Sequence, residues 1–210
     1  MAHIPDGVVS LPVLIVGAAV TVGGCAIGLR RLTPERIPRT ALLAAAFFVA
    51  SLIHVPLGPS SVHLLLCGLV GMILGWAAFP AIAVALMLQA VTFGFGGIAV
   101  LGVNAMNMAV PAVLCGGVFG RARRRWNDPR QLALAGGICG ALGVVLTALA
   151  VAATLAASGR AFVPAARLVV LAHLPVAAVE AAIGAAVVGF VARVRPDLIG
   201  VRAGFAGEPG

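Results

Sequence analysis

Residues 132–157 read LALAGGICGALGVVLTALAVAATLAA, a long run without a single charged side chain. A helix needs about 20 apolar residues to cross the hydrocarbon core of a bilayer, so this run predicts a transmembrane helix. The whole chain has the same character, because 62% of its 210 residues are hydrophobic and 10% are charged. A soluble domain could not cover its surface with so few polar groups. The sequence therefore predicts an all-α integral membrane protein with no room for a soluble catalytic or nucleotide-binding domain.

Proline, glycine and arginine residues divide the apolar sequence into about seven expected transmembrane helices. These spans are residues 10–29, 40–54, 63–79, 81–95, 105–120, 132–157 and 168–192, with a tight reversal marked by Pro80. Several spans are short, and the uncharged stretches 56–62 and 94–104 beside them are candidates for short or re-entrant loops. Ordinary turns are the alternative. We expect one transmembrane domain, residues 1–192, followed by a cytoplasmic tail, residues 193–210.

The arginines predict the orientation of these spans. All fourteen basic residues are arginine, and placing the N-terminus outside puts twelve of them on the cytoplasmic side, within 30–39, 121–130 and 193–202. Only Arg160 and Arg167 then lie outside. The positive-inside rule favours this N-out, C-in topology in the plasma (inner) membrane. It also accounts for the net charge of +8 without nucleic acid as a partner.

Few ionisable groups lie within the spans, and such groups are expensive enough in a membrane to need a reason. They are His54, His63, His173 and Glu180. His173 and Glu180 share one helix face, and we expect them to anchor neighbouring helices rather than to contact a substrate. Glycine pairs four residues apart, such as Gly136 and Gly140, predict close helix contacts.

His3 is a candidate metal ligand, because a histidine beside a free amino terminus can chelate through the amine, a backbone amide nitrogen and its imidazole. These nitrogens suit square-planar Ni(II) or Cu(II), and Co(II) with adjustment. The start of the chain lacks a secretory signal, so we expect the terminus to be retained apart from possible loss of Met1. Loss of Met1 leaves Ala2 and His3 with three nitrogens, and a second histidine completes the plane. If Met1 stays, residues 1–3 supply four nitrogens unaided. The predicted topology places His63 on the same outer side.

Four segments resemble the CbiM/NikM family, the substrate-specific subunits of cobalt and nickel energy-coupling-factor transporters. The first two are HIPDG at residues 3–7 and GPSSVHL at residues 58–64. The third runs from FGFGG at residues 93–97 through LGVN at 101–104 to NMA at 107–109, and the fourth is AHLP at 172–175 with Glu180. The segments occur in the family's order and span nearly the whole chain. Family members commonly begin Met-His, whereas Ala2 intervenes here, so loss of Met1 would restore the usual arrangement.

The resemblance implies a membrane subunit that captures divalent cobalt or nickel at the outer face and has no enzymatic activity or cofactor. Its implied metal ligands are the terminal nitrogens of Ala2 together with His3 and His63. Ser60, Ser61, Asn104 and Asn107 would orient these ligands. The chain has no phosphate-binding loop, so ATP hydrolysis is expected on cytoplasmic ATPase subunits, coupled through a membrane-embedded subunit and a possible small accessory membrane subunit.

Two other functions are compatible with the polar residues. One is an intramembrane serine hydrolase with Ser60 or Ser61 as nucleophile and His173 as base, although no carboxylate obviously orients that histidine. The other is a proton-coupled carrier that uses His173 and Glu180. Residue identity does not decide between cobalt and nickel, because both accept nitrogen ligands.

Overall fold

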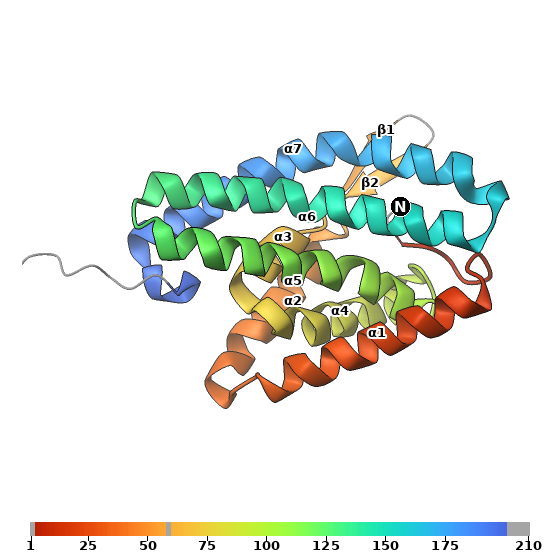
Figure 1. Cartoon of the computed structure of the whole chain (residues 1–210), viewed down its shortest axis with the longest axis horizontal. Coiled ribbons are helices and arrows are strands. Elements are labelled where there is room, and N and C mark those ends of the chain that lie inside the picture. The colour runs from red at the N-terminus through yellow and green to blue at the C-terminus, as the bar shows by residue number, and fades with distance from the viewer. Residues whose placement is uncertain (1–2, 58–59, 201–210) are drawn as a thin grey trace, which may run out of the picture.

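A computed structural model of the protein describes residues 3–57 and 60–200, with side chains outside 54–62 (Figure 1). This part of the chain is nearly all-helical. Its α-helices are α1 (Leu11–Arg30), α2 (Ile37–Ala50), α3 (Cys67–Leu74), α4 (Ala78–Phe93), α5 (Leu101–Arg125), α6 (Pro129–Ser158) and α7 (Val163–Val194). Four short 3-10 helices adjoin them: η1 (Pro34–Arg36), η2 (Gly75–Ala77), η3 (Arg160–Phe162) and η4 (Pro196–Ile199).

Five helical stretches within the described residues are long and apolar enough to cross a membrane, namely 11–30, 67–93, 101–125, 129–158 and 160–194. The protein is therefore a multi-pass membrane protein. The expected count of seven spans is not confirmed, because α2 has 14 residues and α3 has 8. A full crossing needs about 20 residues.

The stretch 67–93 contains a sharp bend at Gly75, where η2 links α3 to α4. Before the bend, Gly71 approaches Ala112 and Gly75 approaches Gly116, so α3 runs parallel to α5. After the bend, Trp76 approaches Gly28 and Phe79 approaches Gly24, so the chain runs antiparallel to α1. Since α1 and α5 point the same way (Figure 1), the chain reverses direction at the bend. Gly75 has a φ of 56°, a left-handed conformation that favours glycine. The expected reversal thus exists, but it precedes Pro80, which lies in the first turn of α4.

Two short strands, called the hairpin below, lie between α2 and α3. Strands β1 (His54–Leu57) and β2 (Ser60–His63) pair antiparallel, with His54 opposite His63. The predicted end of the second span at His54 and start of the third at His63 are therefore wrong. Pro56 disfavours helix for the residue before it, and β-branched Val55 favours extended backbone. In the loop expected at 56–62, the described residues 56–57 and 60–62 thus belong to paired strands.

The glycine-rich stretch expected to be a loop over residues 94–104 is a loop only up to Val100. Residues 101–104 belong to α5 instead. The Asp6 carboxylate accepts a hydrogen bond of 3.1 Å from the Val100 N–H, which caps the start of α5. This cap comes from a segment far away in sequence, so the periodicity of residues 94–104 does not reveal it.

Close glycine contacts hold the long helices together, as the glycine spacing predicted. A Cβ on Gly136 of α6 would lie 2.6 Å from the Gly184 carbonyl oxygen of α7, and a Cβ on Gly140 would lie closer still to the Glu180 carbonyl oxygen. Such approach lets two helix backbones pack directly against each other. Helices α6 and α7 thereby form a rigid pair along one side of the bundle (Figure 1).

The arginine-bearing segments meet at one end of the bundle. Arg39, after α1, donates a hydrogen bond of 2.9 Å to the Leu198 carbonyl of η4. Arg123, near the end of α5, donates one of 2.6 Å to the Ile199 carbonyl. These contacts place the segments that follow α1, α5 and α7 together, as the predicted topology requires of loops on one membrane side.

Candidate metal centre

Two histidines from distant segments lie side by side in the structure. The imidazole rings of His3 and His63 are stacked, with centroids 4.9 Å apart and planes inclined by 15°. Both residues are buried, with 6% and 2% of their surfaces exposed. Sixty residues of chain, including α1 and α2, separate them in sequence. The fold therefore brings together the two histidines that the sequence analysis selected.

The amide of Asn104 fixes the chain next to His3. Its Nδ2 donates to the Ile4 carbonyl and its Oδ1 accepts from the Ile4 N–H, each at 3.0 Å. This pair of hydrogen bonds satisfies both backbone groups of one buried residue, as a β-ladder would. Asn104 lies in the first turn of α5, so the amino-terminal segment is attached to a rigid helix. Asn104 therefore orients the backbone beside the candidate ligand rather than the imidazole itself.

The glycine-rich loop before α5 closes over the same segment. Gly96 has a φ of 77°, and a Cβ there would lie 2.9 Å from Asn104 Nδ2 and 3.6 Å from His3 Cβ. The Phe95 ring stacks on His3 with centroids 6.3 Å apart. A side chain at Gly96 would thus press on the Asn104 amide and on His3. This close approach explains why the loop carries glycine at this position.

The His63 ring contacts the backbone of the next residue. Its Nδ1 lies 3.0 Å from the Leu64 carbonyl oxygen, which can only accept a hydrogen bond. In the neutral ring, a proton on Nδ1 leaves the lone pair on Nε2, the atom that a metal would bind.

The carboxylate of Glu180 holds the turn that follows His63. Glu180 Oε1 accepts hydrogen bonds from the backbone N–H groups of Leu65 and Leu66, the second at 2.8 Å. Leu66 precedes α3 and has a φ of 49°, a conformation unusual for leucine. The expected helix anchor thus joins α7 to the backbone two residues beyond His63.

Other predicted polar residues lie on the neighbouring helices. Asn107 accepts a hydrogen bond of 3.0 Å from Thr154 of α6, which ties α5 to α6. His173 Nδ1 donates to the Val169 carbonyl within α7 at 2.7 Å. Within the described residues, Asn107 Nδ2 and His173 Nε2 are buried without a hydrogen-bond partner.

Three predicted site residues have no described side chain. Ala2 lies outside the described residues. In β2, Ser60 lies opposite Leu57 and Ser61 lies opposite Pro56. The structure describes only the backbone of these two serines. Across the described residues, no group of three or more His, Cys, Asp or Glu side chains could hold a metal ion. A site built on two imidazoles and backbone nitrogens would not form such a group.

The sequence analysis missed two residues that shape the site. Asp6 was quoted only within the segment 3–7, yet its carboxylate occupies the space where a Cβ of Gly97 would lie. Phe95 stacks on His3 and was read only as part of a glycine-rich run. The sequence offers only their positions as a clue, because Asp6 lies close to His3 and Phe95 lies between glycines. Their roles follow from contacts in the folded protein.

Known proteins resemble this chain over most of its length. Residues 3–198 match the family model CbiM, described as the cobalt uptake substrate-specific transmembrane region. A Haemophilus influenzae protein named for metal transport is 42% identical over 94% of this chain and 96% of its own length. A fused nickel transport protein NikMN of Rhodobacter capsulatus is 41% identical over 51% of this chain and 33% of its own. The crystal structure of a transition metal transporter, 26% identical, superposes with a TM-score of 0.70 over 91% of this chain and 93% of that chain.

The family match begins at His3 and includes every segment that builds the site: the amino-terminal stretch, the hairpin, the glycine-rich loop and α7. The resemblance seen in four short motifs is thus confirmed over the length of the chain. The chain belongs to the CbiM family of cobalt uptake substrate-specific transmembrane regions.

Proposed function

We propose that this protein is the substrate-binding membrane subunit of an energy-coupling-factor transporter for divalent cobalt or nickel. The metal is captured by the amino-terminal nitrogens, by His3 and by His63. The observation that carries the proposal is the stacked contact of the two buried imidazoles, 4.9 Å between centroids. No side-chain carboxylate takes part, so the site consists of nitrogen donors.

The spacing of the rings suits such a site. Metal–nitrogen bonds of about 2.0–2.1 Å place two donors of one square plane about 3–4 Å apart. The centroids of the His3 and His63 rings are 4.9 Å apart, which is close to this range. Nitrogen donors without thiolates suit Ni(II) and Co(II). The hydrogen bonds of Asn104 to the Ile4 backbone restrict the amino-terminal segment that carries the proposed nitrogen donors. Hydrogen-bond partners of a metal-bound histidine fix its ring in a similar way.

The charge distribution supports capture from outside the cell. The arginine-bearing ends of α1, α5 and α7 lie at one end of the bundle, which the positive-inside rule assigns to the cytoplasm. Residues 193–210 then form a cytoplasmic tail to the single transmembrane domain 1–192. The protein resides in the plasma membrane, with His3 and His63 nearer to its outer face.

Transport needs partners that supply energy. The sequence has no phosphate-binding loop, so separate ATPase subunits hydrolyse ATP and a membrane-embedded subunit couples them to this chain. A small accessory membrane subunit is a further candidate partner. The fused NikMN relative supports this arrangement, because the part of that protein matched by this chain is only 33% of its length.

The alternative functions receive less support. Membership of the CbiM family favours transport over an intramembrane hydrolase based on Ser60 or Ser61. His173, the proposed base, donates its Nδ1 proton to the Val169 carbonyl of its own helix. Glu180, the proposed proton carrier, binds two backbone N–H groups and thereby has a structural role.

Metal titration of the purified protein, with mass spectrometry of its amino terminus, tests the proposal. We expect Co(II) or Ni(II) to bind one to one and to raise the melting temperature. Binding displaces protons from the terminal amine, a backbone amide and the imidazoles, so affinity falls as the pH drops. Free imidazole titrates near pH ~6.5, and the loss is steep below about pH 6. Binding that is independent of pH would contradict a nitrogen site.

Glu180 should matter for stability more than for metal affinity. Glu180→Ala leaves the N–H groups of Leu65 and Leu66 without an acceptor, which costs about 1–3 kcal/mol for a buried group. Glu180→Gln keeps one acceptor oxygen and should be intermediate. Thermal unfolding in detergent, with metal titration of the folded fraction, measures both effects. Loss of metal binding in either variant with an unchanged melting temperature would contradict a structural role.

A further inference from the structure

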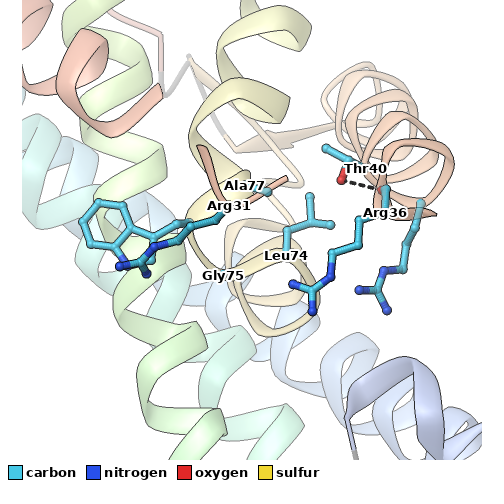
Figure 2. A pocket seen from close by; sticks show the side chains of 8 residues that line it. Arg31, Arg36, Thr40, Leu74, Gly75 and Ala77 are labelled. Carbon is cyan, nitrogen blue, oxygen red and sulfur yellow. Dashed lines mark hydrogen bonds between the residues drawn. The ribbon is translucent and has the colours of Figure 1, made fainter. Parts of the chain in front are cut away.

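Three arginines surround a cavity of about 210 Å³ at the end of the bundle opposite the histidine pair. Arg31 follows α1, Arg36 ends η1 and Arg39 lies in the first turn of α2. Figure 2 shows Arg31 and Arg36 on opposite sides of Leu74 and Gly75, where the chain bends between α3 and α4. The cavity thus concentrates positive charge over a polar backbone turn.

Among the described residues, no carboxylate lies within ion-pair distance of these guanidinium groups, although Arg36 interacts electrostatically with Glu35 and Arg39 with Asp197. Among the described residues the one ion pair joins Arg195 to Asp197, at 2.9 Å. Asp197 lines an adjoining cavity with Arg36 and Arg39, but its charge is already paired there. The Arg31 guanidinium lies 5.5 Å above the Trp76 ring, an arrangement that holds the cation without neutralising it. The cavity therefore suits an anion.

An apolar groove meets this cavity at Thr40. The groove has a volume of about 250 Å³ and runs between α1, α2 and the start of α4. Thr40 lines both spaces, and its hydroxyl is turned inward to donate 2.9 Å to the Arg36 carbonyl. Leu29 and Val84 of the groove are 57% and 55% exposed. A ligand that fills both spaces needs an anionic head and an apolar chain.

From this juxtaposition we infer an anionic phospholipid site, with the phosphate between Arg31, Arg36 and Arg39 and an acyl chain in the groove at Thr40. Arginine matches phosphate geometry through paired N–H donors. Basic pockets between helices on the cytoplasmic side are suited to anionic headgroups. Trp76 at the cavity is the residue type that favours the boundary between headgroups and hydrocarbon. The site is independent of the metal centre.

Fluorescence of Trp76 tests the inference directly. Trp126→Phe leaves Trp76 as the sole tryptophan, and phosphatidylglycerol or phosphatidylcholine brominated on the acyl chain is added to the protein in detergent. We expect quenching at lower concentrations of phosphatidylglycerol. In this background Arg36→Gln/Arg39→Gln should weaken phosphatidylglycerol binding about 30-fold, at about fivefold per charge. The control pair Arg160→Gln/Arg167→Gln removes two charges elsewhere and should change it by less than about twofold.

Further arms identify the source of the phosphate and guard against misfolding. Ala41→Phe fills the groove and should weaken the lipid, whereas inorganic phosphate should not compete at equal concentration. Arg36→Gln alone removes an exposed side chain, and its metal binding should equal that of the parent. Equal quenching by both lipids would overturn the inference. If inorganic phosphate competed fully, the site would bind a free anion instead. The same conclusion would follow if Ala41→Phe left lipid binding unchanged. If the arginine variant lost partner subunits without any change in lipid binding, the surface would be a protein interface.

Discussion

A short uncleaved extension at the amino terminus is expected to abolish high-affinity metal binding, although every side chain of the protein remains. The extension converts the terminal amine into an amide and removes one proposed nitrogen donor. It also has little space to occupy, because His3 is 6% exposed and Ile4 is 3% exposed. The Asn104 bonds to Ile4 hold this segment inside the bundle. We expect a loss of more than about 100-fold, since even partners that only orient a ligand contribute about 10–100-fold.

Titration of purified protein with Co(II) and Ni(II) measures this effect. A tag of equal length at the carboxyl terminus is the control and should leave affinity unchanged, because the described chain ends at the opposite end of the bundle. Acetylation of the amino terminus separates the loss of the amine from the steric effect of a longer extension. It adds only two carbons but converts the basic amine into an amide. An acetylated or extended protein with parental affinity would refute the terminal-amine site.

Replacing His63 with alanine is expected to have an effect of similar size. The substitution removes one imidazole of the stacked pair and leaves a site with too few nitrogens for a square plane. The Nδ1 hydrogen bond that it removes stays within the turn, because its acceptor is the adjacent Leu64. We expect metal affinity to fall more than about 100-fold while the melting temperature without metal stays close to that of the parent.

The matched control is His54→Ala, which removes a histidine from the facing strand of the same hairpin. It should retain metal binding, because His54 is not among the proposed ligands. Equilibrium titration, together with metal-dependent thermal stabilisation, compares both variants with the parent. Unchanged affinity in a folded His63→Ala protein would rule out the proposed donor set. Equal losses in both variants would point to the hairpin rather than to one ligand.

The sequence by itself determined the class of protein and the candidate ligands. An apolar run as long as residues 132–157 predicts a transmembrane helix whatever its neighbours are. Its side chains favour the hydrocarbon core of a bilayer, and a helix satisfies its backbone hydrogen bonds internally there. The predicted sixth and seventh spans accordingly lie within α6 and α7. His3 and His63 could be selected because a histidine beside the terminus can chelate a metal, because the predicted topology places both on one membrane side, and because both lie in segments that resemble the CbiM/NikM family.

Only the tertiary structure decided the short elements and the construction of the site. Strands β1 and β2 and the bend at Gly75 replace the helix ends expected there, and the start of α5 at Leu101 has a cap from a distant segment, Asp6 at Val100. A short apolar segment fits a strand, a helix or a loop equally well, so its partners choose among them. The same holds for function: Asn104 clamps Ile4, and Glu180 holds the turn after His63, across about a hundred residues of chain. Such pairings arise only when folding removes the sequence separation, so composition and spacing carry no record of them.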